Sequence, residues 1–161
     1  MTCEMTTAPK PGYRPCVGIM LLDAADRVFV GQRCDTRAEA WQMPQGGIDA
    51  GEEAVSAGLR ELEEEIGTGA AVLLCESRWW RSYDLPPDIA RRLWHGRYRG
   101  QTQKWLAFRF TGTDSDIVID GSHAEFCAWR WLPPVDLVRR IVPFKRDVYL
   151  SVVEEFRHLL A

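Results

Sequence analysis

The order of apolar and polar positions predicts strands on both sides of one long helix. A continuous apolar run at Cys16–Leu22 is typical of a buried strand, and Val28–Val30 begins its hairpin partner. In Gln103–Thr111, Trp105 and Ala107 alternate with Leu106, Phe108 and Phe110, which predicts a central strand. Other extended segments are expected at Trp41–Pro44, at Ala71–Tyr83 as one strand or two, and at Glu125–Leu132.

Two segments have the helical period. Gly46–Thr68 begins as a glycine-rich loop and continues as a helix that ends at Gly67, because glycine is favoured just beyond a helix. The second helix is expected from Pro143, which suits a first turn, to about Leu160. The apolar stripe of the first helix consists of Val55, Leu59, Leu62 and Ile66.

The remaining segments are expected to be connections. Leu85–Ile89 is predicted as a loop, Asp114–Ser122 as a loop or short edge strand, and Val135–Arg140 as one helical turn. Residues 1–11 are small and polar with two prolines, which predicts a disordered tail, and residues 12–161 form a single domain. Strands around a central helix, with a second helix closing the chain, indicate a mixed sheet between helices.

Composition narrows the class of protein. The chain has 161 residues, of which 46% are hydrophobic and 27% charged, as in a soluble globular domain. A net charge of −3 argues against binding of long nucleic acid such as double-stranded DNA. The N-terminus has no apolar run of signal-peptide length and no segment approaches membrane-spanning length, so a cytoplasmic protein is expected. The five cysteines are scattered without a C-x-x-C pair, so we expect reduced thiols, with neither a disulfide framework nor a zinc site.

The candidate chemistry lies on the first helix. Glu61, Glu64 and Glu65 fall on one face, where like charges at this spacing repel one another. A hard divalent cation such as Mg²⁺ or Mn²⁺ would compensate, since both prefer oxygen ligands and substrate phosphates. Small residues on the same side (Ala54, Ala57 and Gly58) are expected to leave room for that approach. The alternative interpretation is a solvated acidic helix.

This stretch resembles the Nudix box, G-x5-E-x7-R-E-U-x-E-E-x-G-U, in which U is a bulky aliphatic residue. Its fixed positions are filled in one register by Gly46, Glu52, Arg60, Glu61, Leu62, Glu64, Glu65 and Gly67. Thr68 departs from the pattern at the final packing position. The resemblance implies an α/β/α sandwich with a mixed central sheet, and Mg²⁺-dependent hydrolysis within a polyphosphate chain by a metal-activated water.

The resemblance also implies a role for each box residue. Glu61, Glu64 and Glu65 would bind the metal ions, together with the Gly46 carbonyl group. Arg60 would orient a carboxylate, and Glu52 and Gly67 would support the geometry of the loop and helix. Glu53 and Glu63 lie outside the motif. Glu53 is expected to lie in the first turn, where the helix dipole favours an acidic residue, and Glu63 is expected to be solvated.

Further segments resemble the bacterial RNA pyrophosphohydrolases, which are close to asymmetric diadenosine tetraphosphate hydrolases. They are GYRPCVG from Gly12, WQMPQGGI from Trp41, SYDLP from Ser82, GQTQKW from Gly100, EFCAWRW from Glu125 and PFKRDVY from Pro143. The resemblance implies removal of pyrophosphate or phosphate from the 5′ end of RNA, which initiates mRNA decay, or cleavage of a dinucleoside polyphosphate. A third alternative is an inactive nucleotide-binding regulator, against which the intact glutamates argue.

The matching segments supply candidate substrate contacts. Glu125 would be a further metal ligand or general base, or else a charged residue at the start of a strand. Arg14, Lys104 and Tyr83 would contact phosphates, although Tyr83 is equally explained as a core residue with a bonded hydroxyl group. Arg33 and Phe144 would hold a nucleobase between them, with Phe144 as a plain core residue the alternative. Lys145 would lie on phosphate or base, and Gln42 and Gln45 would read polar atoms.

One basic stretch has no place in the resemblance. Arg91–Gly100 contains arginine without acidic residues, so it either guides a polyanion or forms a solvated loop.

Overall fold

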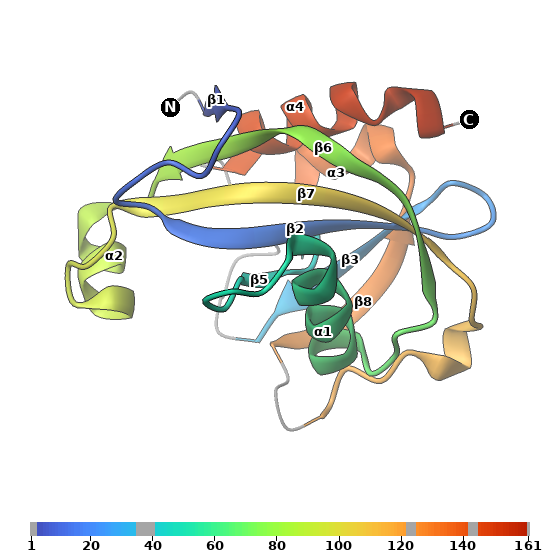
Figure 1. The fold of residues 1–161 in the computed structure, drawn as a ribbon. Helices are drawn as coiled ribbons and strands as arrows, with labels where there is room; N and C mark the ends of the chain where they lie inside the picture. Colours follow the sequence, from blue (N-terminus) through green and yellow to red (C-terminus); the bar gives the residue numbers. More distant parts are fainter. Residues whose placement is uncertain (1–2, 35–40, 122–124, 142–144, 161) are drawn as a thin grey trace.

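The computed structural model describes residues 3–34, 41–121, 125–141 and 145–160. Strands β6, β7 and β2 run along the centre of the molecule, with α1 on one side and α3 and α4 on the other (Figure 1). The strands are β1 (Glu4–Thr6), β2 (Arg14–Leu22), β3 (Val28–Arg33), β4 (Trp41–Gln42), β5 (Gln45–Gly47), β6 (Ala71–Asp84), β7 (Gly100–Phe110) and β8 (Phe126–Leu132). The helices are α1 (Ala54–Ile66), α2 (Pro87–Trp94), α3 (Pro134–Arg140) and α4 (Arg146–Glu155), with 3-10 turns η1 (Asp114–Asp116) and η3 (Arg157–Leu159).

The sheet is mixed, as expected for an α/β/α sandwich. Its strand order is β1-β6-β7-β2-β3-β4, with β5 paired to β2 and β8 paired to β3. The β2 and β7 strands are parallel, and the other recorded pairs are antiparallel. The expected hairpin is present, because Leu22 of β2 lies opposite Val28 of β3. The expected central strand β7 lies between β6 and β2.

Each face of the sheet carries its own hydrophobic core. Leu106 and Phe108 of β7 face α1, where Leu62 and Ile66 are fully buried, as the two predicted stripes require. Trp105 and Ala107 point to the opposite face and pack against α3 and α4. Burial of both faces explains why β2 reads as a continuous apolar run instead of an alternating one.

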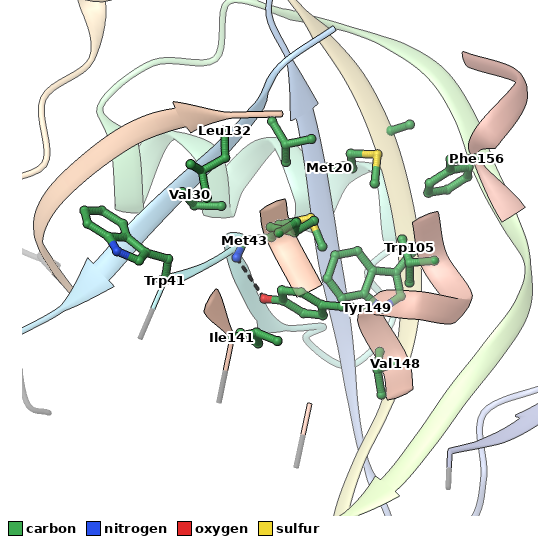
Figure 2. Packing of buried hydrophobic residues seen from close by; sticks show 14 of the residues in the cluster. Met20, Val30, Trp41, Met43, Trp105, Leu132, Ile141, Val148, Tyr149 and Phe156 are labelled. Carbon is green, nitrogen blue, oxygen red and sulfur yellow. Dashed lines mark hydrogen bonds between the residues drawn. The ribbon is translucent and has the colours of Figure 1, made fainter. Parts of the chain in front are cut away.

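The second core also positions the segment before the glycine loop. Tyr149 of α4 accepts a hydrogen bond at 2.8 Å from the backbone N–H of Met43, and its ring meets Trp105 edge to face at 5.6 Å (Figure 2). Burial raises the pKa of the Tyr149 hydroxyl above its ordinary value, so this group stays neutral. Through this hydrogen bond α4 holds the backbone at Met43 in place, just before β5 begins.

Several sequence predictions are wrong. The expected loop at Leu85–Ile89 contains the start of α2, because Pro87 needs no N–H partner in a first turn and Asp88 favours the positive end of the helix dipole. The expected disordered tail contains β1, which pairs with β6. The expected last helix ends at Glu155 and continues as η3. The segment after Thr113 is a loop, the first of its two expected forms, with one 3-10 turn at Asp114–Asp116. The pairing of β1 with β6 depends on a neighbour that local periodicity does not report, whereas the start of α2 carries local signals.

The cysteine prediction is also wrong. Cys34 and Cys127 form a disulfide, although 93 residues separate them along the chain. Their Cα atoms are 5.0 Å apart, a distance that suits a disulfide. The pairing follows from the contact between the end of β3 and the start of β8, which no spacing along the sequence reveals.

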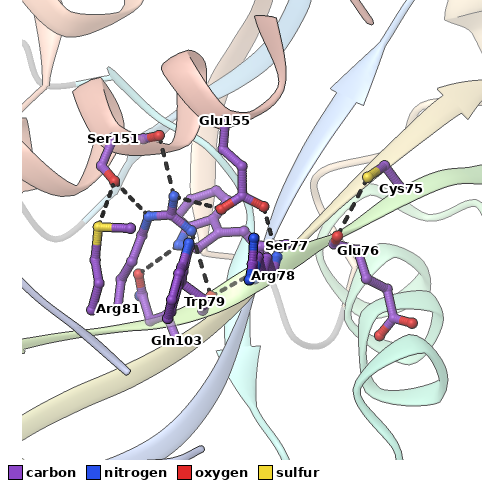
Figure 3. A network of polar contacts seen from close by, with 11 residues as sticks. Cys75, Glu76, Ser77, Arg78, Trp79, Arg81, Gln103, Ser151 and Glu155 are labelled. Atoms are coloured by element: carbon purple, nitrogen blue, oxygen red, sulfur yellow. Dashed lines mark hydrogen bonds and ion pairs between the residues drawn. The ribbon is translucent and has the colours of Figure 1, made fainter. Parts of the chain in front are cut away.

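A buried arginine ties α4 to β6. The Arg81 side chain is 1% exposed; it donates to the Ser151 hydroxyl group at 2.8 Å and to the Glu155 carboxylate at 2.8 Å (Figure 3). The other Glu155 oxygen accepts from the backbone N–H of Arg78 at 2.7 Å. The ion pair is therefore embedded in further hydrogen bonds, as a buried pair requires.

Replacing Arg81 with alanine is expected to lower the free energy of unfolding by roughly 3 kcal/mol, because the partly buried Glu155 carboxylate and the Ser151 hydroxyl group lose the buried guanidinium that binds them. Urea unfolding measures the change. Arg78→Ala is the matched control, since it removes an exposed guanidinium and leaves the backbone bond to Glu155 in place. An equal loss in both variants would contradict this account.

Candidate active site

Arg60 joins the glycine loop to α1. Its guanidinium donates to both oxygens of Glu52, at 3.0 and 2.9 Å, and to the Gly47 carbonyl oxygen at 2.8 Å. These hydrogen bonds and the Asp49 N–H lower the pKa of Glu52 to about 2. The loop therefore has a fixed position relative to the helix that carries the other carboxylates.

The Arg60 guanidinium also lies between two of the candidate metal ligands and contacts both of them. Its Nη1 atom lies 2.9 Å from a Glu61 oxygen and 3.5 Å from a Glu64 oxygen. Burial raises the pKa of Glu61, and the nearby charge of Glu64 adds to the effect. Arg60 thus offsets part of the repulsion that the sequence indicated.

Glu65 carries the most unusual environment in the site. It is 2% exposed, and neither carboxylate oxygen has a hydrogen-bond partner in the described part of the chain. Burial raises its pKa well above the ordinary value, and the charges of Glu125 and Glu61 raise it further. An ionised carboxylate buried without partners is strongly unfavourable, so this position is suited to a cation that supplies the missing interaction.

The donor set fits a hard divalent cation in type, although its members are not yet gathered around one point. Within the described ranges, no three His, Cys, Asp or Glu side chains form a ready-made metal cage. Glu61 and Glu64 both contact Arg60. Glu61, Glu64, Glu65 and Glu125 would hold the ion through oxygen atoms, with Glu65 in greatest need of it.

Two glycines let the loop pass close to charged side chains. A Cβ atom on Gly46 would lie 1.9 Å from the Glu61 carboxyl carbon, and one on Gly47 would lie 2.3 Å from Arg14 Nη2. The loop therefore runs between the carboxylates of α1 and the guanidinium of Arg14. A Cβ atom at either position would push these side-chain ends away, so glycine keeps the loop in close contact with both groups.

The expected role of the small residues on α1 is wrong. Ala57 is fully buried, and a Cβ atom on Gly58 would lie 2.6 Å from Leu106 Cδ1. Their size lets α1 pack closely on β7, and they do not open a path to the carboxylates. The helical period correctly predicted that the small residues lie on the same side of α1 as the carboxylates. That side of the helix, however, adjoins the hydrophobic core.

Glu125 and Arg33 meet where β3 ends and β8 begins. Arg33 Nη1 lies 3.7 Å from a Glu125 carboxylate oxygen, and Glu125 lies close enough to Glu65 to raise its pKa. The backbone carbonyl of Glu125 accepts from the Cys34 N–H at 3.1 Å. Residues 33 and 125, far apart in sequence, therefore share one edge of the site with α1.

Lys145 lies close to this group of residues, near Arg33, Glu65 and Glu125. It is 7% exposed, and its ammonium group donates to Gln45 Oε1 at 3.3 Å. Burial lowers the pKa of Lys145 to about 8, and the positive charge of Arg33 contributes in the same direction. A cation is thus placed near Glu65 and Glu125, whose negative charges act against that decrease.

A buried chain of polar side chains continues from Gln45, which sequence reasoning missed in part. Gln103 Nε2 donates to Gln45 Oε1 at 3.1 Å and to Gln101 Oε1 at 3.0 Å, and the Tyr83 hydroxyl donates to Gln101 at 2.8 Å. Tyr83 is 4% exposed and lies in the core with a bonded hydroxyl group, which is the second of its two expected placements. The signal was available, because Gln101 and Gln103 share the buried face of β7 with Trp105.

The remaining candidate contacts are spread around this edge. Lys104 of β7 lies opposite Val17 of β2, which lies opposite Gly46 of β5, so the three residues cross the sheet in line. Gln42 is buried, and its Nε2 atom has no partner in the described ranges. Phe144 lies outside the described residues. The Arg91–Gly100 stretch is exposed on and after α2, at one end of the sheet, except for Trp94, Tyr98 and Gly100 (Figure 1).

Replacing Lys145 with methionine is expected to stabilise the metal-free protein by up to about 3 kcal/mol at pH 7. The reason is that burial of the ammonium group lowers its pKa from 10.5 to about 8, which costs the folded state free energy. Between about pH 8 and 10.5 the Lys145 side chain is protonated in the unfolded chain and largely deprotonated in the folded protein. The free energy of unfolding of the wild type therefore rises with pH from about 8 to 10.5. Urea unfolding from pH 7 to 10 with a chelator should show this rise in the wild type only. Lys104→Met, at a partly exposed lysine, is the control, and an unchanged slope in Lys145→Met would contradict the assignment.

A glycine loop clamped to an acidic helix, on a mixed sheet between helices, is the arrangement of a Nudix domain. The NUDIX domain model matches residues 12–152, and the chain belongs to the Nudix family. Members of this family use divalent cations. The chain is also similar to the RNA pyrophosphohydrolase of Roseobacter denitrificans, at 56% identity over 89% of this chain and 91% of that protein. The RNA pyrophosphohydrolase of Rhodospirillum rubrum is 59% identical over 89% and 86% of the two chains.

Solved structures show the same fold at low sequence identity. The E. coli dihydroneopterin triphosphate pyrophosphohydrolase has a TM-score of 0.66 and 19% identity, covering 87% of this chain and 95% of that one. The C. elegans Ap4A hydrolase has a TM-score of 0.62 and 17% identity, covering 90% and 99%. The chain is thus an enzyme of the Nudix pyrophosphohydrolase class. Over the described residues, no helix combines the length and apolar character needed to cross a membrane.

Proposed function

We propose that this enzyme removes pyrophosphate, or phosphate, from the 5′ triphosphate or diphosphate end of RNA, with Mg²⁺ as the preferred ion. The observation that carries the proposal is Glu65, a buried carboxylate whose oxygens have no hydrogen-bond partner among the described residues. It lies beside Glu61 and Glu125 and near the cations Arg33 and Lys145. Similarity to RNA pyrophosphohydrolases over nine-tenths of the chain supports RNA as the substrate. With RNA as its substrate, the enzyme would act in the cytoplasm, where it would start mRNA decay.

In this proposal the acidic side chains bind the metal ion and the basic side chains bind the substrate. A bound divalent cation neutralises phosphate charge and makes a water molecule more acidic, so that a nucleophile exists near neutral pH. Glu61, Glu64, Glu65 and Glu125 would hold that ion, and Arg60 keeps Glu61 and Glu64 in position. Arg14, Lys104 and Lys145 would bind the phosphate chain from the cationic side. Arg33 would stack on a nucleobase, together with Phe144.

Product analysis tests the proposal directly. The enzyme is incubated with 5′-triphosphorylated RNA and, separately, with diadenosine tetraphosphate, each with Mg²⁺, and products are resolved by chromatography. We expect monophosphorylated RNA and released pyrophosphate or phosphate, at a higher kcat/KM than for the dinucleotide. Faster cleavage of the dinucleotide would favour the alternative hydrolase. Tight binding without cleavage of either substrate would favour a nucleotide-binding regulator.

A further inference from the structure

The disulfide between Cys34 and Cys127 lies on the surface beside the active site. Both cysteines are exposed, whereas Cys16 is buried and Cys3 and Cys75 are partly buried. Cys34 follows Arg33 directly, and Cys127 is two residues beyond Glu125. Small molecules can therefore reach this bond from solvent.

The cross-link fastens the two strand ends that present Arg33 and Glu125. The Cys34 N–H donates to the Glu125 carbonyl at 3.1 Å, and the Arg33 guanidinium lies 3.7 Å from the Glu125 carboxylate. The regular pairing of β3 with β8 shifts between Gln32 and Arg33, just before the cross-link. The disulfide therefore adds a covalent constraint at a point where the backbone pairing is irregular.

We propose that Cys34 and Cys127 are a dithiol–disulfide modification site for small thiols and disulfides, and that its oxidised form holds Glu125 and Arg33 in their active-site positions. The cross-link itself is independent of the proposed function. Its effect on metal binding rests on the proposed role of Glu125. Groups that orient a metal ligand commonly change metal affinity by roughly tenfold or more when they are lost.

The chemistry is balanced by a low-molecular-weight disulfide such as oxidised glutathione. One cysteine thiolate attacks a sulfur of that disulfide, forms a mixed disulfide and releases one small thiolate. The second cysteine thiolate then attacks the protein sulfur of the mixed disulfide and releases the other small thiolate. The two cysteines lose two electrons to the small disulfide, and their two protons end on the two small thiols. A small dithiol reverses the reaction.

Thiol counting tests formation of the bond. Wild-type protein is equilibrated with oxidised or reduced glutathione, freed of it, denatured and titrated for thiols. Five cysteines with one disulfide leave three thiols after oxidation, and five are expected after reduction. Cys34→Ser/Cys127→Ser should give three thiols in both states. Five thiols in the oxidised wild type would overturn the proposal whatever the enzyme hydrolyses.

Mn²⁺ binding tests the effect on the site without relying on activity. Free Mn²⁺ is measured by electron paramagnetic resonance during titration of each form. Reduction should weaken Mn²⁺ affinity roughly tenfold in the wild type, and the double variant should match the reduced wild type in either glutathione state. Cys75→Ser is the control and should keep the full redox response.

Equal Mn²⁺ affinity in oxidised and reduced wild type would overturn the proposal, even if the disulfide forms. The comparison needs no substitution, so poor folding of a variant cannot obscure it. Hydrolysis of triphosphorylated RNA by both forms is followed in parallel. Loss of RNA hydrolysis in both forms, with a redox-dependent Mn²⁺ affinity, would contradict the proposed function and support the modification site.

Discussion

Replacing Glu64 with glutamine should lower kcat for release of pyrophosphate from RNA by roughly 10³-fold, because a metal ligand contributes several kcal/mol of charge stabilisation in the transition state. Glutamine keeps the shape of the side chain and removes its negative charge. Glu64 is partly exposed, and its recorded ion pair is a 3.5 Å contact with Arg60, so the fold should change little. Steady-state kinetics with triphosphorylated RNA and Mg²⁺ measure the loss, and thermal unfolding checks the fold.

Glu63→Gln is the matched control for this substitution. Glu63 is the adjacent residue on α1, is exposed and lies outside the Nudix box. Its replacement should leave kcat within about twofold, as expected for a surface site remote from the chemistry. If Glu64→Gln keeps more than about a tenth of wild-type activity, a loss below 1.4 kcal/mol, Glu64 is not an essential metal ligand.

Replacing Glu65 with glutamine should abolish most activity and at the same time stabilise the metal-free protein. The folded pKa of Glu65 is raised, so the folded protein binds more protons than the unfolded chain between the ordinary pKa of 4.5 and the raised value. Stability of the wild type therefore falls as pH rises through this window, and glutamine, which does not ionise, removes the decrease. Above the window, the buried charge lowers the free energy of unfolding of the wild type alone.

Thermal unfolding with a chelator, from pH 5 to 9, measures this effect. We expect the melting temperature of Glu65→Gln to exceed that of the wild type by at least about 2 °C at the upper end of the range. Added Mg²⁺ should raise the melting temperature of the wild type more than that of the variant, because ligand binding stabilises only the form that binds it. Glu63→Gln should follow the wild type throughout. A variant less stable than the wild type without metal would show that Glu65 has a structural role instead.

Both substitutions address a conflict that the fold itself creates. The helix face that carries Glu61 and Glu65 is also the face that adjoins the core, since Ala57 and Leu62 are fully buried beside them. The protein therefore keeps carboxylates where burial opposes their charge, as functional sites often do. Arg60 offsets the repulsion for Glu61 and Glu64, but its recorded contacts do not extend to Glu65.

Local features of the sequence determined much of this protein. The spacing from Gly46 to Gly67 places the helix, its end and its acidic face, because these depend on the 3.6-residue period and on glycine in a left-handed turn. The alternation in β7 assigned its side chains to two cores correctly. The start of α2 at Pro87 was open to the same reasoning but was missed.

Tertiary structure alone decided burial and partnership. Glu64 and Glu65 are adjacent and identical residues of the box, yet Glu64 is partly exposed, whereas Glu65 is buried and has no hydrogen-bond partner over the described ranges. The difference arises because Glu65 lies beside Glu61 and Glu125 and Glu64 contacts Arg60. The Cys34–Cys127 bond and the Arg33–Glu125 contact exist because β3 pairs with β8 across some ninety intervening residues. Periodicity reports which side of an element a residue takes, whereas its pKa and its neighbours are set by the segment that packs there.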